Sequence, residues 1–166
     1  MEKIFKLSIF VIFIIYSQIL SAKENIVFID LNYVLNKSND GKKILEELKN
    51  ISEINKEKFN KEERLLEKER NDIKKLKNII SKDEYNKKVS LFQEKVEIYN
   101  KEKSNILKSF ENKKKKELDI FFKSLNEIMN VYMKENSISI IIDKKNIVMA
   151  AVKNDISNEI IDLVNK

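Results

Sequence analysis

The 166-residue chain has no cysteine, no histidine, no proline and no tryptophan, and its single glycine is Gly41. Without cysteine it has no disulfide framework and no thiol chemistry. Without cysteine and histidine, the Ser-His, Cys-His and His-metal constellations cannot be built. Paired carboxylates remain, but they need a concave site, and a chain with so few turn residues offers few loops to form one. The composition argues against an enzyme, and we expect no cofactor.

The N-terminus has the three parts of a secretory signal. Lys3 and Lys6 precede an apolar stretch over residues 7–20, which ends in the small residues Ser21 and Ala22. The alternative is an uncleaved membrane anchor, but about 14 apolar residues fall short of the roughly 20 that a spanning helix needs. We expect residues 1–22 to be a signal peptide cleaved after Ala22. Export without disulfides favours the bacterial periplasm.

Two short β-like zones enclose a long helical one. Residues 23–37 and 137–166 are rich in β-branched apolar residues, and residues 38–136 are dominated by charged helix formers. Ser38, Asn39 and Asp40 supply oxygens that can cap the first helix. The predicted class is α+β, mostly α: a helical arm on a small β body.

The arm can be read as one helix or two. Ser81 followed by Glu84 forms a capping box, which favours a new helix start, although no glycine or proline forces a turn there. From Tyr85 to Phe110, apolar residues recur in alternating steps of four and three residues, the spacing of the buried seam of a coiled coil, and Lys103 is the one polar residue in this series. The steps break at residues 113–116, so we expect a hinge over residues 107–118.

The apolar seam must be buried against another helix or surface. It resumes at Leu118, Phe121, Leu125, Ile128 and Tyr132. We expect the preceding helix, folded back antiparallel with a turn near residues 80–82, to cover it. This long helical hairpin, a coiled-coil arm, brings the two β-like zones together.

The body is predicted to contain a β-hairpin. Residues 139–142 and 147–152 are apolar and flank the polar turn 143–146. Ser157 is the expected cap of a final helix. Because the strands are apolar on both faces, the body is expected to self-associate; the candidate oligomerisation residues are Ile26, Phe28, Ile140, Ile142 and Val148.

Positive charge is concentrated on the arm. Residues 55–116 carry 20 basic and 12 acidic side chains, a net charge of +8. A lysine-rich genome alone could produce such helices. A basic surface nevertheless attracts acidic partners, so acidic unfolded polypeptides, acidic membrane surfaces and lipopolysaccharide are candidates, with Lys82, Lys87 and Lys88 as contacts at the arm tip. Nucleic acid is not expected for an exported protein.

The order of these features resembles the OmpH/Skp family of periplasmic chaperones. Near the N-terminus the matching stretches are residues 26–30 ("IVFID"), 34–35 ("VL"), Ser38 and 41–43 ("GKK"). Near the C-terminus they are residues 141–143 ("IID") with the following 147–151, and then 155–161 ("DISNEII") with 163–165 ("LVN"). Family members often have a proline where this chain has Asn39. The resemblance implies a jellyfish-like homotrimer that holds unfolded outer-membrane proteins between its arms without ATP, and the chain has no GxxxxGK loop.

Two other functions remain open. Exported helical hairpins also serve as structural spacers, although spacers tend to have a continuous seam. A polyanion-binding protein would use the basic arms directly, and its binding would fall steeply with salt.

Overall fold

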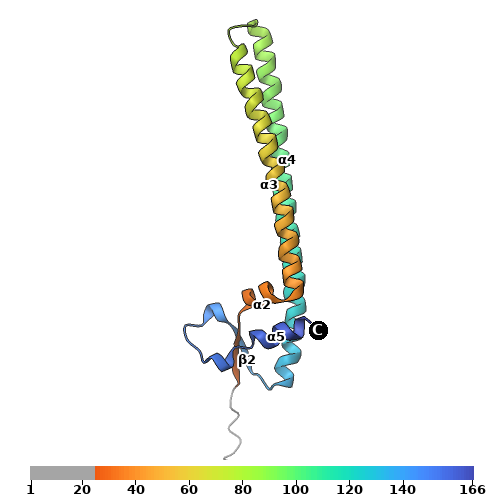
Figure 1. Ribbon diagram of the computed structural model, residues 1–166, viewed down its shortest axis with the longest axis vertical. Coiled ribbons are helices and arrows are strands. Elements are labelled where there is room, and N and C mark those ends of the chain that lie inside the picture. The colour runs from red at the N-terminus through yellow and green to blue at the C-terminus, as the bar shows by residue number, and fades with distance from the viewer. Residues whose placement is uncertain (1–24) are drawn as a thin grey trace, which may run out of the picture.

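The computed structural model describes residues 25–166, so the predicted signal peptide, residues 1–22, lies outside the described residues. The elements in chain order are β1 (Ile26–Ile29), α2 (Leu31–Lys37), α3 (Asn39–Leu76), α4 (Lys82–Glu135), β2 (Ile140–Asp143), the 3₁₀ turns η1 (Lys144–Asn146) and η2 (Val152–Asn154), and α5 (Ser157–Val164). A two-helix arm, α3 and α4, stands on a small root (Figure 1). The root is the body predicted from the sequence and consists of β1, α2, β2, η1, η2, α5 and the lower end of α4. The predicted mostly α class with a small sheet and a helical hairpin is confirmed.

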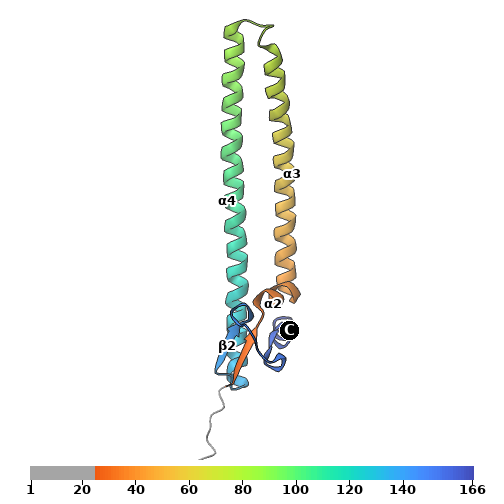
Figure 2. The same cartoon turned by 90° about the vertical axis from the view of Figure 1, so that its left-hand side faces the viewer.

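The arm consists of α3 and α4, which run antiparallel and side by side in both views (Figures 1 and 2). They contain 38 and 54 residues, so at 1.5 Å per residue they span about 57 and 81 Å. The lower end of α4 therefore continues past the start of α3 into the root. There it contributes Phe121 and Leu125, which are buried in the root core.

The predicted seam of α4 packs against α3. Every predicted position from Tyr85 to Phe110, Lys103 included, is half-buried, while the residues between them are exposed. Along α3 the half-buried or buried series is Ile51, Asn55, Phe59, Glu62, Leu66, Glu69, Ile73 and Leu76. Both series advance mainly by three and four residues, as expected for a two-helix coiled coil.

Local capping sets the ends of the arm helices. Ser38 is the N-cap of α3, where its Oγ accepts a hydrogen bond from the Gly41 amide at 3.2 Å. Ser81 is the N-cap of α4, and both halves of its capping box with Glu84 are present. The predicted capping box is thus confirmed, and the alternative of one uninterrupted helix is wrong.

Gly41 lies at the corner between α2 and α3. A Cβ atom at this position would sit 1.9 Å from the Leu35 carbonyl oxygen and 2.8 Å from Ser38 Oγ. The end of α2 can approach the first turn of α3 this closely only because residue 41 has no side chain.

The sheet differs from the predicted hairpin. β1 pairs with β2 in parallel, from Ile26 opposite Ile140 to Ile29 opposite Asp143. Residues 147–151 form no strand, so the predicted β-hairpin of residues 139–142 and 147–152 is wrong.

The polar turn directs the chain away from β2. Asp143 Oδ1 accepts a hydrogen bond from the Lys145 amide, and η1 follows. The chain returns to β1 only at Ile156, whose amide donates to the Phe28 carbonyl. Residues 147–154 therefore form an outward loop, which Figure 1 shows on the side of the root away from the C-terminus.

The two faces of the sheet have different surroundings. Val27 and Ile29 belong to the root core, and the partly buried Ile141 packs against it. The core also contains Val34, Leu35, Phe121, Leu125, Ile138, Ile156, Ile160 and Ile161. Because side chains alternate along a strand, Ile26, Phe28, Ile140 and Ile142 lie on the opposite face.

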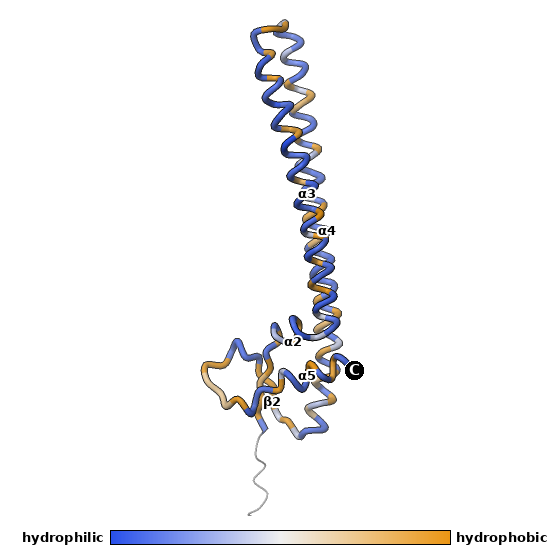
Figure 3. The backbone as a smooth tube through the Cα atoms, viewed as in Figure 1, coloured by the Kyte–Doolittle hydropathy of each residue, from blue (hydrophilic) through white to orange (hydrophobic). Residues whose placement is uncertain are grey.

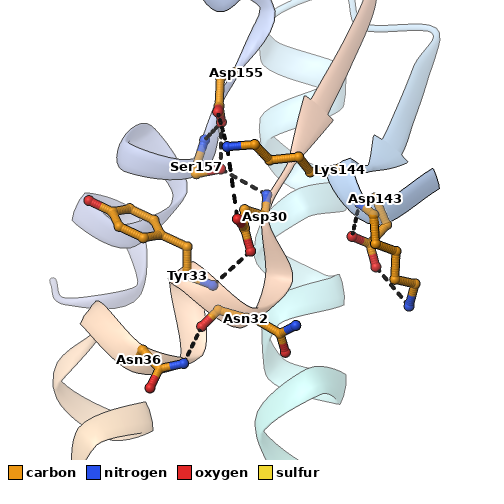
Figure 4. Close-up of polar contacts among 9 residues, drawn as sticks. Asp30, Asn32, Tyr33, Asn36, Asp143, Lys144, Asp155 and Ser157 are labelled. Atoms are coloured by element: carbon orange, nitrogen blue, oxygen red, sulfur yellow. Dashed lines mark hydrogen bonds and ion pairs between the residues drawn. The ribbon is translucent and has the colours of Figure 1, made fainter. Parts of the chain in front are cut away.

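A polar junction joins β1 to α5 (Figure 4). The Asp30 amide donates to Ser157 Oγ at 2.8 Å, and Lys144 Nζ lies 3.9 Å from Asp30 and 3.4 Å from Asp155. Burial alone would raise the pKa of Asp155, but hydrogen bonds from Ser157 and the charge of Lys144 hold it below its ordinary value. The predicted cap at Ser157 is wrong: Ser157 is the first residue of α5, and its hydroxyl bonds Asp30 and Asp155 instead.

Candidate functional site

Most exposed large apolar side chains of the arm share one sequence context. Seven of them directly precede a buried or half-buried residue that faces the other helix or the root: Ile54, Leu65, Ile79, Leu91, Ile98, Ile120 and Val131. Leu107, which follows the seam residue Ile106, is the exception. Figure 3 shows such apolar positions recurring along the otherwise polar arm.

This context places six of these side chains, those in α3 and α4, on one face; Ile79 lies in the turn between the two helices. In a helix, the residue before a seam position is rotated about 100° to one side. Because α3 and α4 run in opposite directions, that rotation turns the preceding residues of both helices toward the same side of the pair. The arm therefore carries an apolar stripe that extends from the outer half of the arm into the root, defined by Ile54, Leu65, Leu91, Ile98, Ile120 and Val131.

The stripe deepens into a groove in the outer half of the arm. Leu65, Leu91 and Ile98 line a hollow of about 520 Å³ together with the buried Ile73 and half-buried Leu76. A second hollow of about 400 Å³ adjoins it and shares Leu65 and Ile98. Leu65, Leu91 and Ile98 are between 51% and 53% exposed, so they are accessible to another molecule without any change in the arm.

Charged side chains bridge the helices beside the groove. Lys95 Nζ lies 2.6 Å from Glu69 Oε1 and joins α4 to α3 between the two hollows. The rim also carries Lys68, Lys88 and Glu94. Both signs of charge therefore border this apolar surface.

A polar cluster fixes the register of the arm below the groove. Glu63 Oε1 accepts hydrogen bonds from Lys103 Nζ and Tyr99 Oη, each at 2.7 Å. These bonds hold the pKa of Glu63 below its ordinary 4.5, and the bond to Glu63 raises the pKa of Lys103. Lys103 Nζ also lies 5.2 Å from the Phe59 ring centroid. The polar seam position seen in the sequence is thus satisfied by α3.

The break in the seam is bridged by another ion pair. Lys113 occupies a half-buried position, and its Nζ lies 2.8 Å from Glu47 Oε1 on α3. The hydrogen bond to Glu47 raises the pKa of Lys113. α4 continues as a helix through residues 107–118, and the hinge expected there stays a prediction.

The predicted polyanion contacts lie at the outer end of the arm. Lys82 begins α4, and Lys87 and Lys88 follow in its second turn. All three are exposed, and in the described part of the chain none lies within ion-pair distance of a carboxylate. Lys88 also lines the groove, whereas Lys82 and Lys87 do not.

The predicted oligomerisation residues fall into two places. Ile26 pairs with Ile140 and Phe28 with Ile142 on the outer face of the sheet. Ile26 and Ile140 are 40% and 45% exposed, whereas Phe28 is buried at 7%. Val148 is separate from them, fully exposed on the outward loop.

At the root the stripe ends in two further hollows. One, of about 330 Å³, lies between Ile44, Ile120, Ile128 and Val164; the other, of about 380 Å³, lies between Ile128, Val131, Tyr132 and Leu163. Ile128 lines both, so the two form one surface where α4 meets α5. The charged residues that line the second hollow are Glu127 and Glu135.

The comparisons with known proteins agree with this architecture. The model of the family described as "Outer membrane protein (OmpH-like)" matches residues 25–164. The chain belongs to the OmpH-like family. The crystal structure of a candidate outer membrane chaperone (OmpH-like) from Caulobacter crescentus CB15 matches with a TM-score of 0.74 and 18% identity, over 87% of this chain and 85% of that chain. At that identity the match shows a shared fold. No curated protein matches the chain.

Sequence reasoning missed the groove. None of Leu65, Leu91 and Ile98 was predicted as part of a binding site. The signal was present as apolar pairs, Leu65-Leu66, Leu91-Phe92 and Ile98-Tyr99. In a two-helix arm the second residue of each pair fills the seam, so the first has no partner within the arm.

Proposed function

We propose that this OmpH-like protein is an ATP-independent periplasmic holdase chaperone that binds unfolded outer-membrane proteins and prevents their aggregation before insertion. The observation that carries the proposal is the half-exposed groove at Leu65, Leu91 and Ile98 on a long arm. The word chaperone in the name of the Caulobacter relative, and the family description, give it support.

The groove suits weak contact with many clients. Its apolar side chains are half exposed and bordered by both signs of charge, so a segment with apolar and polar residues gains burial without a unique shape. The net positive charge of the outer arm speeds the capture of acidic segments. Several such arms around one client would raise the overall affinity through effective concentration.

The proposed active form is a homotrimer joined through the root. Its support is the outer face of the sheet, where Ile26 and Ile140 remain 40% and 45% exposed in the single chain. A two-stranded sheet with apolar side chains on both faces is marginal by itself, and a second and third copy would cover the outer face. The number three rests on the family resemblance.

The test is aggregation on dilution. An outer-membrane β-barrel unfolded in urea is diluted with and without the chain lacking residues 1–22, in the absence of ATP, and light scattering is followed. We expect suppression that saturates at about three copies per client, the trimer of the resemblance. Replacing Leu65, Leu91 and Ile98 together by Gln, a good helix former, should weaken suppression at least tenfold while helical circular dichroism stays unchanged.

The matched control replaces Leu107, which is 47% exposed but lies off the stripe, by Gln and should keep full suppression. Suppression that persists in 0.5 M salt would separate apolar client binding from purely electrostatic binding. No suppression at any ratio would refute the holdase and favour the structural spacer.

A second candidate function is binding of acidic membrane surfaces or lipopolysaccharide at the arm tip. The observation in its favour is that Lys82, Lys87 and Lys88 are exposed beside Ile79, which is 75% exposed. Vesicles with 30% anionic lipid, with or without lipopolysaccharide, should co-sediment with the chain at low salt and lose it when the three lysines become Gln. Equal co-sedimentation of the variant would exclude this contact.

A further inference from the structure

The second hollow of the groove is held in place from the other side of the arm. Tyr99, a seam residue of α4, lines this hollow together with Leu65 and Ile98. Its hydroxyl donates a hydrogen bond to Glu63 Oε1 at 2.7 Å. Glu63 and Leu65 are two residues apart on α3, so their side chains are rotated by about 200° around the helix. Tyr99 therefore lies between the groove on one side of the arm and a carboxylate on the other.

Lys103 completes this arrangement. Its Nζ lies 2.7 Å from Glu63 Oε1, and 5.2 and 5.7 Å from the ring centroids of Phe59 and Tyr99. The side chains of Glu63 and Lys103 are 48% and 35% exposed, and an isolated ion pair at such exposure contributes little. Here, however, one carboxylate oxygen accepts two hydrogen bonds, and the ammonium lies near one aromatic ring from each helix. Glu63, Tyr99 and Lys103 together form the register cluster.

The charged members of the register cluster lie outside the groove. Neither Glu63 nor Lys103 lines the hollow of about 520 Å³ or the hollow of about 400 Å³. A substitution of Glu63 therefore removes no side chain from the groove. Its effect on the groove must pass through Tyr99 and through the packing of α4 against α3.

The outer arm needs such polar bridges because the seam of α3 is poor in apolar residues there. Asn55, Glu62 and Glu69 occupy three of its half-buried positions, so these positions bury no apolar side chain against α4. Two short bridges join the helices at this level, Lys95 with Glu69 and the register cluster. With less apolar burial to set the spacing of the helices, the bridges help to set it.

The sequence around Glu63 allows the register cluster to form in one register. A coiled coil repeats every seven residues, so a slip by one repeat would bring Lys56 or Arg70 to the place of Glu63. Either side chain would repel Lys103. The cluster is therefore satisfied only as it is observed.

The groove depends on the same register. A slip by seven residues would put Lys58 or Asp72 in the place of Leu65. Both hollows would then lose the half-exposed leucine that they share. The register that satisfies the cluster is thus the register that supplies the groove with its apolar side chain from α3.

We infer that Glu63 is a positioning residue for the client groove. From the other side of the arm it holds Tyr99 and Lys103. This cluster keeps α3 and α4 in the one spacing and register in which the groove forms, and Glu63 itself contacts no client. The inference rests on the proposed function, because it names the residues that shape the same groove.

The first test measures the groove without a client. The chain has no cysteine, so Lys68→Cys and Lys88→Cys on the groove rim, one on each helix, can carry nitroxide labels in the chain lacking residues 1–22. An excess of unlabelled chain restricts the measurement to distances within one copy. We expect one narrow distance distribution, and a distribution about twice as wide when Glu63→Ala is added. Alanine is the better helix former, so helical circular dichroism should stay unchanged.

The second test measures client affinity, from the fluorescence anisotropy of a labelled outer-membrane β-barrel diluted from urea. Losing both hydrogen bonds in Glu63→Ala should weaken binding about fivefold to tenfold. Tyr99→Phe keeps the ring that lines the hollow but removes its hydrogen bond, and should weaken binding about threefold. Glu63→Gln retains an oxygen that can accept from both donors, so its affinity should stay within about twofold of the wild type.

The matched control is Glu47→Ala. It removes another bridge between the helices, to Lys113 at 2.8 Å, and Glu47 lines neither hollow. This variant should leave the label distances and the client affinity unaltered.

Three outcomes would overturn the inference. The first is unchanged distances and affinity in Glu63→Ala. The second is an equal loss in Glu47→Ala, which would mean that the whole arm has loosened. The third is wider distances with an unchanged affinity, which would place clients elsewhere on the chain. A wild-type chain that binds no client would instead refute the holdase, and the label distances would then decide the role of the cluster in shaping the groove.

Discussion

Replacing Gly41 by alanine should destabilise the protein, although the position is helical and alanine is the better helix former by about 1 kcal/mol. The added Cβ would lie 1.9 Å from the Leu35 carbonyl oxygen, whereas ordinary contacts begin near 3.4 Å. The end of α2 would have to retreat by about 1.5 Å, the difference between these two distances, and Val34 and Leu35 are buried in the root core.

The cost has two parts. Overpacking a buried site typically costs about 1–3 kcal/mol. The same Cβ would lie 2.8 Å from Ser38 Oγ, which caps α3, and losing such a cap costs about 0.5–2 kcal/mol. After subtracting the propensity gain, we expect a net loss of about 2 kcal/mol, or roughly 4–8 °C in the midpoint of thermal unfolding.

The assay is urea and thermal unfolding followed by circular dichroism. Asn50, exposed two turns further along α3, provides the control: Asn50→Ala should be more stable than Asn50→Gly by about 1 kcal/mol. A Gly41→Ala protein as stable as the wild type, or more stable, would refute the close approach of α2 to α3 as the reason for the glycine.

Three further predictions concern the core, the register cluster and the arm. Leu125→Ala should cost about 2–5 kcal/mol in unfolding free energy, because Leu125 is 1% exposed; a loss below 1 kcal/mol in urea titration would contradict its central place. Because the pKa of Glu63 is lower in the folded chain than its ordinary 4.5, the ionised carboxylate stabilises the folded chain above pH 4.5. This stabilisation is lost as the pH falls through the lowered pKa. Melting temperatures of Glu63→Gln should thus depend less on pH between 5 and 3 than those of the wild type, and parallel curves would count against the cluster. Amide exchange should be faster over residues 107–118 than in the root, and uniform protection would rule out the hinge.

Much of the arm could be predicted because its determinants are local. Ser81 and Glu84 are three residues apart, and the spacing of the α4 seam can be read without knowing its partner. The sheet could not be read in this way. The pattern of residues 139–152 fits a hairpin, but the pairing of β2 with β1 depends on residues more than a hundred positions away.

The candidate site shows the same division. The lysines near the tip could be read from the composition, and the structure places them exposed at the outer end of the arm. Their contact with an acidic partner stays a prediction. The antiparallel direction of α3 and α4 was itself predicted, but placing Leu65 and Leu91 on one side also required the seam of α3. That seam includes the polar residues Asn55, Glu62 and Glu69, so apolar spacing alone does not reveal it. The position of Val148 on a loop depended on η1, where Lys144 reaches Asp30 and Asp155 instead of continuing a hairpin.

The parallel pairing of Ile26 with Ile140 also sets an order of folding. β1 is synthesised first, yet its partner strand follows only after the whole arm. Joining such distant strands directly would carry a large loop-closure cost. Once α3 and α4 have paired along their length, starting at the turn before Ser81, however, β1 and β2 are held close to each other. We therefore expect the arm to form early, and the root, with any contact between copies, to complete last, after almost the entire chain has been synthesised.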